Sequence, residues 1–155
     1  MKILYICTHN RCRSILCEAI TNASKGNVVA RSAGSQPVGE VHPLSLKYLA
    51  ERGIDTEGLR SQSWDEFEDY NADLVVTVCD SAAGESCPVY FGKSLKVHWG
   101  LEDPSKLKGT EEEKAKAFNT TIDIIEKRVA ALAELADKNL DKAALKEALS
   151  NLGAN

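Results

Sequence analysis

The sequence has no long hydrophobic run, and its first apolar stretch, residues 3–6, is far too short for a signal peptide or a membrane-spanning helix. It also lacks an excess of basic residues, because its formal net charge is -4 at pH 7. Without a basic field over the whole protein, neither nucleic acid nor an acidic membrane surface is attracted. We therefore expect a cytoplasmic protein that binds no nucleic acid and no membrane.

Cysteine is scarce, with five residues in a chain of 155, which is an odd number. A chain of this length buries a core without disulfide staples, so a secreted disulfide framework is not expected. In a reducing compartment such cysteines indicate redox or nucleophilic chemistry, or metal binding. The spacing of Cys79 and Cys87 is wide for a zinc ligand pair, and no histidine follows at zinc-finger spacing. We therefore predict no metal site.

What the sequence does contain is an alternation of short apolar runs and helical patterns. Apolar runs predict strands over residues 3–6, 27–32, 74–78 and 95–99. Helical spacing predicts a helix just after the first strand and others over 44–52 and 110–136. This order predicts an α/β fold, a three-layer, doubly wound, four-stranded parallel sheet that binds ligands at the carboxyl ends of its strands.

The length and composition fit a single domain over residues 1–155, with a core over 1–136 and a C-terminal helical extension over 137–155. Ser63 is expected to cap a short helix, and Asp141 to cap the helix of the extension. The long helix carries an apolar stripe that predicts core packing, made by Phe118, Ile122, Ile125, Val129, Leu132 and Leu135. Whether the last helix packs on the domain or forms an interface stays open.

The segment from Cys7 to Ser14 lies between the first strand and the first helix, and the rest of the function depends on it. Backbone N–H groups at a helix N-terminus, together with the helix dipole, bind a tetrahedral oxyanion. The positive surroundings are expected to lower the pKa of the Cys7 thiol, so that a nucleophilic thiolate is present at neutral pH. Arg13, six residues later, offers a planar pair of donors for two oxygens of such an anion.

Two further segments follow strands three and four and are expected at the same sheet edge. Cys79 and Cys87 bracket a small, polar segment, and together with Cys7 they place three thiols at one sheet edge, which permits sequential disulfide exchange. The alternative is that the thiols of Cys79 and Cys87 stay unlinked in a turn. Asp103 precedes Pro104, which favours an extended backbone, and its carboxyl is a candidate general acid for a substrate held by Cys7. An aspartate before proline is also a common turn former, and Glu102 is the weaker candidate.

These segments resemble the low-molecular-weight protein tyrosine phosphatase superfamily. The resemblance covers residues 1–135 and includes the Cys7–Ser14 loop, the turn at 32–34 and Asp103-Pro104. Within the superfamily, the segments 76–79, 87–88 and 98–104 resemble the thioredoxin-coupled arsenate reductases. The tyrosines expected after the aspartate-proline pair of a phosphatase are replaced here by Ser105 and Lys106, which favours the reductase.

The resemblance implies a mechanism. Cys7 attacks arsenate, Arg13 binds it, Ser14 keeps Cys7 ionised and Asp103 acts as the general acid. The oxyanion lies among the loop residues Thr8, His9, Asn10, Arg11, Cys12 and Arg13. Cys79 then displaces arsenite by forming a disulfide with Cys7, and Cys87 resolves that disulfide. No cofactor is bound; an external dithiol reduces the last disulfide, supplied by thioredoxin, glutaredoxin or a low-molecular-weight thiol, and the protein is expected to act as a monomer.

Some reductases of this kind also bind potassium beside the loop, and Asn10, Glu18 and Ser32 match three of the ligands. Arg60 and Gln62 stand where the other two are expected, so we predict no dependence on an alkali cation and expect Arg60 to supply its positive charge to Glu18. Of the remaining thiols, Cys12 is either a partner for a side disulfide with Cys7 or a small loop filler. Cys17 is interpreted as a packed side chain.

Two other functions compete with arsenate reduction. A phosphatase acting on phosphotyrosine or small phosphoesters would use Cys7, Arg13 and Asp103 but neither Cys79 nor Cys87. A sensor of oxyanions or arsenite would bind through its thiols without turnover, and it has no use for a general acid at Asp103. Loss of turnover on changing Cys79 separates the reductase from the phosphatase.

Overall fold

The fold is built on a parallel sheet of four short strands. The computed structural model describes residues 1–24, 26–78, 94–138 and 140–153. The strands are β1 (Lys2–Ile6), β2 (Val29–Ala33), β3 (Leu74–Thr77) and β4 (Leu95–His98). Their order is β2-β1-β3-β4, so the chain starts in the middle of the sheet and winds outwards in both directions. The predicted α/β fold with a doubly wound, four-stranded parallel sheet is confirmed.

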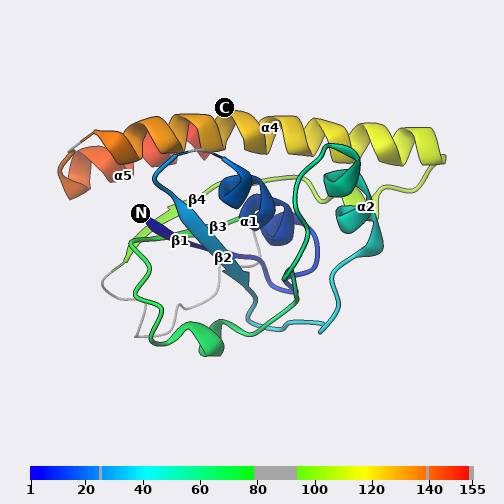
Figure 1. The fold of residues 1–155 in the computed structure, drawn as a ribbon, viewed down its shortest axis with the longest axis horizontal. Helices are drawn as coiled ribbons and strands as arrows, with labels where there is room; N and C mark the ends of the chain where they lie inside the picture. Colours follow the sequence, from blue (N-terminus) through cyan, green and yellow to red (C-terminus); the bar gives the residue numbers. More distant parts are fainter. Residues whose placement is uncertain (25, 79–93, 139, 154–155) are drawn as a thin grey trace.

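Among the described residues, four helices and two 3₁₀ turns surround this sheet. They are α1 (Arg13–Ala23), α2 (Pro43–Glu51), α4 (Glu111–Asp137) and α5 (Lys142–Gly153), with η1 (Trp64–Phe67) and η3 (Pro104–Lys106). Helix α1 packs on β1 and β2, and α4 lies along α1, with α2 near one end and α5 near the other (Figure 1). Within the described residues, no helix is long and apolar enough to cross a membrane.

Local sequence signals account for where these elements begin. The hydroxyl of Thr110 accepts a hydrogen bond from the backbone N–H of Glu113 (3.2 Å) and caps α4. Ser63 and Glu66 form a capping box around η1, which confirms the predicted cap. In the last helix the carboxylate of Asp141 accepts from the N–H of Ala144 (2.8 Å), again as predicted.

The core lies between the sheet and the helices. The apolar stripe of α4 is buried as predicted, except that Leu135 is only partly covered. Helix α5 contacts β4 and α4, and the indole N–H of Trp99 donates to the carbonyl oxygen of Leu149 (2.8 Å). The C-terminal helix therefore packs on the domain.

Candidate active site

The β1–α1 loop lies at the carboxyl end of the central strand β1, with Cys7 at its start and Arg13 as the first residue of α1. Carbonyl oxygens of Thr8, His9 and Arg11 accept hydrogen bonds from backbone N–H groups of the segment 36–42, at 2.9 to 3.2 Å. In a trans peptide the N–H points opposite to the C=O. The N–H groups of residues 9, 10 and 12 therefore point away from that segment, as an oxyanion-binding loop requires.

Asn10 holds the shape of this loop. It adopts a left-handed backbone conformation (φ 47°), is fully buried, and donates from Nδ2 to the hydroxyl of Ser14 (2.8 Å). Its Oδ1 accepts from the backbone N–H of Gln62 (2.8 Å), which ties the loop to the segment before η1. Because Ser14 accepts from Asn10, the Ser14 hydroxyl keeps its own proton to donate. These hydrogen bonds give Asn10 a structural role in the loop, and the role of Ser14 towards Cys7 stays a prediction.

Arg13 and Asp103 meet at this edge of the sheet although they are far apart in the sequence. The guanidinium donates from Nη1 to the carbonyl oxygen of Leu101 (3.0 Å), and its Nη2 lies 3.7 Å from Oδ2 of Asp103. The other carboxylate oxygen of Asp103 accepts from the N–H and the hydroxyl of Ser105, at 3.0 and 2.5 Å. The Nε of Arg13 is buried and has no hydrogen-bond partner among the described residues. A donor left without a partner there is suited to bind an anion.

A cavity of about 40 Å³ lies against these side chains. It holds roughly three water-sized spheres, which is the scale of a small tetrahedral oxyanion. It is lined by Cys7, His9, Arg11, Cys12, Arg13, Asp103 and Lys106. The structure thus brings the predicted nucleophile, the predicted arginine and the predicted acid together. Thr8, Asn10 and Ser14 do not line the cavity, and Cys79 and Cys87 lie outside the described residues.

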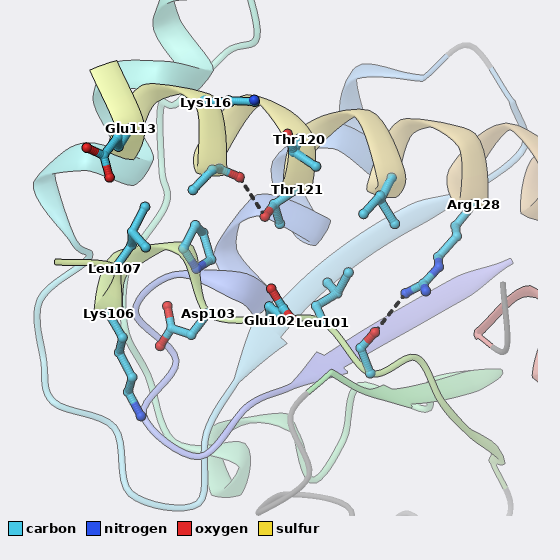
Figure 2. Close-up of a pocket in the computed structure, with 14 residues that line it drawn as sticks. Leu101, Glu102, Asp103, Lys106, Leu107, Glu113, Lys116, Thr120, Thr121 and Arg128 are labelled. Carbon is cyan, nitrogen blue, oxygen red and sulfur yellow. Dashed lines mark hydrogen bonds between the residues drawn. The ribbon is translucent and has the colours of Figure 1, made fainter. Parts of the chain in front are cut away.

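Lys106 is a residue of this cavity that sequence reasoning missed. In the sequence, Lys106 stands out only because it occupies a position where a phosphatase of this superfamily is expected to have a tyrosine. Its position at the end of the 3₁₀ turn that follows Asp103 brings it back beside the acid, three residues on. A larger cavity of about 730 Å³ lies between residues 100–107 and α4, and shares Asp103 and Lys106 with the small one (Figure 2).

The other two described cysteines are buried in the protein. Burial raises the pKa of the Cys12 thiol to about 12, so this thiol is protonated at neutral pH although it lines the cavity. Burial also raises the pKa of Cys17, which belongs to the hydrophobic core. The interpretation of Cys17 as a packed side chain is confirmed.

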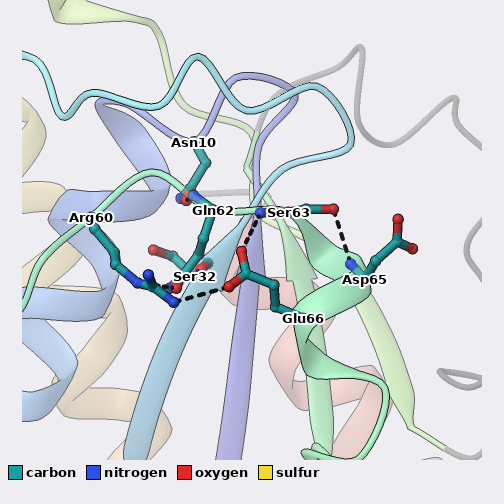
Figure 3. Close-up of polar contacts among 7 residues, drawn as sticks. All are labelled: Asn10, Ser32, Arg60, Gln62, Ser63, Asp65 and Glu66. Atoms are coloured by element: carbon teal, nitrogen blue, oxygen red, sulfur yellow. Dashed lines mark hydrogen bonds and ion pairs between the residues drawn. The ribbon is translucent and has the colours of Figure 1, made fainter.

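The predicted interaction of Arg60 with Glu18 is wrong. Arg60 instead forms an ion pair through Nη2 with Oε1 of Glu66 (2.9 Å) and donates from Nε to Oε1 of Gln62 (2.8 Å), as Figure 3 shows. The pair with Glu66 is exposed, so the guanidinium stays hydrated there, whereas Glu18 is buried. Moving Arg60 to Glu18 would require desolvation of the arginine.

Glu18 is satisfied by other groups at the expected cation position. Its carboxyl group accepts a hydrogen bond from the hydroxyl of Ser32 (2.7 Å), and burial raises the pKa of the Glu18 carboxyl. The side-chain amide of Gln62 is buried and donates to the backbone carbonyl of Ser32 (3.0 Å; Figure 3). Gln62 therefore supplies a neutral donor to the backbone carbonyl of Ser32, one of the residues that match the potassium ligands.

Comparison with known proteins assigns the family. A profile described as "Low molecular weight phosphotyrosine protein phosphatase" matches residues 2–146. The chain belongs to this family. The arsenate reductase of Halalkalibacterium halodurans is 39% identical over 133 residues, which are 85% of this chain and 94% of that protein. The arsenate reductase of Bacillus subtilis is 38% identical over 135 residues, 86% of this chain and 96% of that protein. The resemblance to the superfamily and to its arsenate reductases is confirmed.

Solved structures agree with this family assignment. A structure described as "An arsenate reductase in the phosphate binding state" has a TM-score of 0.70 and 26% identity, covering 86% of this chain and 96% of that one. A thioredoxin-dependent arsenate reductase of Corynebacterium glutamicum has a TM-score of 0.58 and 29% identity, covering 83% of this chain and 61% of that one. The prediction that the chain is an enzyme of this family is confirmed, whereas the roles of individual residues stay predictions.

Proposed function

We propose that this protein is an arsenate reductase that reduces arsenate to arsenite through a relay of Cys7, Cys79 and Cys87. The observation that carries the proposal is the 40 Å³ cavity, where Cys7, Arg13 and Asp103 line one space. A nucleophile, a cation with an unused donor and a candidate acid are the groups that attack on a small oxyanion requires. The relatives named arsenate reductases support the choice of arsenate as the substrate.

In the first step, the Cys7 thiolate attacks the arsenic atom and forms a sulfur–arsenic bond. Arg13 and the backbone N–H groups of residues 8–13 bind the oxygens and stabilise the negative charge. Asp103 donates a proton to an outgoing oxygen, which leaves as water.

The electrons come from the protein thiols. The Cys79 thiolate attacks the sulfur of Cys7, the sulfur–arsenic bond breaks with its electron pair on arsenic, and arsenite leaves as a Cys7–Cys79 disulfide forms. Cys87 then attacks Cys79, releases Cys7 and leaves a Cys79–Cys87 disulfide. One supporting observation concerns Val78, the residue before Cys79, whose N–H donates to the carbonyl oxygen of Ile6 (3.0 Å), the residue before Cys7. The described residues that precede the two cysteines in sequence are therefore hydrogen-bonded neighbours.

The Cys79–Cys87 disulfide requires an external dithiol, because no cofactor is part of this cycle. We propose thioredoxin as that dithiol in the cytoplasm, with glutaredoxin or a low-molecular-weight thiol as the alternatives, and a monomer as the working form. The thioredoxin-dependent relative from Corynebacterium glutamicum supports the first choice.

The test is arsenate-dependent NADPH oxidation by the purified protein. Thioredoxin with its reductase is compared with glutaredoxin, glutathione and glutathione reductase, and the proposal expects turnover with the thioredoxin pair. Cys79→Ser should abolish turnover while leaving the first chemical step, whereas Cys17→Ala serves as a control and should keep turnover. No arsenate-dependent oxidation with either reductant would overturn the proposal.

The same variant separates the reductase from the phosphatase alternative. A phosphatase needs neither Cys79 nor Cys87, so hydrolysis of p-nitrophenyl phosphate should survive Cys79→Ser. Efficient hydrolysis by the natural chain and by Cys79→Ser, together with no arsenate reduction, would identify a hydrolase.

A further inference from the structure

Lys106 is a third cation at the oxyanion cavity, besides Arg11 and Arg13. It ends the 3₁₀ turn η3, and its backbone N–H donates to the carbonyl oxygen of Asp103 (3.3 Å). Figure 2 shows its side chain extending from η3 past Asp103 towards the β1–α1 loop. Among the residues that the structure describes, the ammonium group of Lys106 forms no ion pair, and the residue is exposed to solvent.

The position of Lys106 beside the acid determines which part of a substrate it meets. In the proposed mechanism, the loop N–H groups and Arg13 bind oxygens that face into the cavity, while Asp103 serves the outgoing oxygen. Lys106 lines the same cavity three residues after Asp103, so its ammonium group is the cation closest in sequence to the acid that serves the outgoing oxygen. In a free oxyanion that oxygen is a charged or hydroxyl acceptor for the ammonium group. In a monoester it carries a carbon substituent, and a contact with the ammonium group is weakened.

We propose that Lys106 is a substrate-binding residue that selects free inorganic oxyanions over their organic monoesters. The identity of the natural substrate rests on the proposed function, whereas the preference for an unsubstituted oxyanion rests on the cavity itself. The tyrosines expected in a phosphatase at positions 105 and 106 would place aromatic surface where this chain has a cation. An ammonium group is strongly hydrated and a poor support for an aromatic leaving group.

The first test measures binding without turnover, by protection of Cys7 from alkylation with iodoacetamide. Inorganic phosphate and methylphosphonate are the probes, because they differ in one oxygen that a methyl group replaces. In Lys106→Met, the phosphate concentration that protects half of Cys7 should rise about tenfold, the effect of one lost charge-assisted contact. The methylphosphonate concentration should change less than about twofold, and Lys106→Arg should keep most of the phosphate affinity.

Lys116 is the matched control. It is an exposed lysine that lines the larger cavity but not the oxyanion cavity, and Figure 2 shows it on α4, away from Lys106. Lys116→Met should leave the affinity for both probes unchanged. Equal weakening of both probes in Lys106→Met, or no weakening of either, would overturn the proposal.

A kinetic split provides the second test. Lys106→Met should raise KM for arsenate about tenfold and change kcat much less, because the lost contact acts on binding. The protection assay does not depend on reduction of arsenate. If the natural chain fails to oxidise NADPH with arsenate but Lys106→Met loses its preference for phosphate, the proposed function is wrong and the role of Lys106 stands.

Discussion

Removal of the Asn10 side chain should destabilise the protein more than its size suggests. Asn10→Ala deletes two buried hydrogen bonds, to Ser14 and from Gln62, and leaves both partner groups in the interior. Each buried group without a partner costs about 1–3 kcal/mol. Alanine also tolerates the left-handed backbone at φ 47° less well than asparagine. We expect a loss of about 3 kcal/mol or more, which for a chain of this size lowers Tm by roughly 6–12 °C.

Asn71 offers a control for the backbone contribution. It also has a left-handed conformation (φ 55°), but it is exposed, and its side chain makes one exposed hydrogen bond to the carbonyl oxygen of Asp69. Urea unfolding separates the contribution of the hydrogen bonds from that of the left-handed backbone when four variants are compared: Asn10→Ala, Asn10→Gly, Asn71→Ala and Asn71→Gly. Each glycine variant removes the penalty of the left-handed backbone. Asn71→Ala should cost no more than about 1 kcal/mol. If Asn10→Ala costs no more than Asn71→Ala, the buried hydrogen bonds do not stabilise the loop and the reasoning fails.

Four further predictions concern individual groups. The raised pKa of the Glu18 carboxyl means that the folded chain binds this proton more tightly than the unfolded chain, so the associated stability is complete below about pH 4.3 and is lost as the pH rises through the raised pKa. Denaturant midpoints should therefore show Glu18→Gln gaining stability over the natural chain as the pH increases. A difference in stability that stays constant with pH would contradict this. Gly34→Ala places a Cβ 2.5 and 2.7 Å from backbone oxygens of the β1–α1 loop, so it should cost about 1–3 kcal/mol in urea unfolding and reduce turnover. Exchange of sodium chloride for potassium chloride should leave Tm and turnover unchanged, because the Gln62 amide already donates to a carbonyl of the expected cation site, and a large gain in potassium would contradict this. Cys12, with a pKa of about 12, should stay unmodified when iodoacetamide alkylates Cys7 near neutral pH, as peptide mapping by mass spectrometry can show.

Much of the fold was predictable because its elements have local causes. The run at Leu74–Thr77 is β-branched and apolar, which suits a strand buried on both faces, and it forms β3. Thr110, Ser63 and Asp141 are cap residues whose side chains bond to backbone groups two or three residues away. Such contacts depend on nearby sequence alone. Strands and helix caps of this kind can therefore be predicted from the sequence.

The parts of the site that escaped prediction depend on contacts between distant segments. Strand order predicts that Cys7 and Asp103 share an edge, and both line the cavity. The pattern does not predict that Gln62 reaches Asn10, because 52 residues separate them. Arg60 pairs with Glu66 rather than with Glu18, because an exposed partner on its own segment avoids desolvation. Lys106 was missed because a surface lysine has no periodicity to mark it.

The contact between Trp99 and Leu149 can form only after α5 has been synthesised, which matters for how the site is completed in a growing chain. The β1–α1 loop and α1 precede α5 in the chain, whereas the indole of Trp99, next to β4, finds its acceptor only when α5 has been synthesised. A nascent or prematurely ended chain without α5 would leave that buried donor unpaired beside the loop of the proton donor. The nucleophile is thus synthesised before the contact that supports the loop of the proton donor.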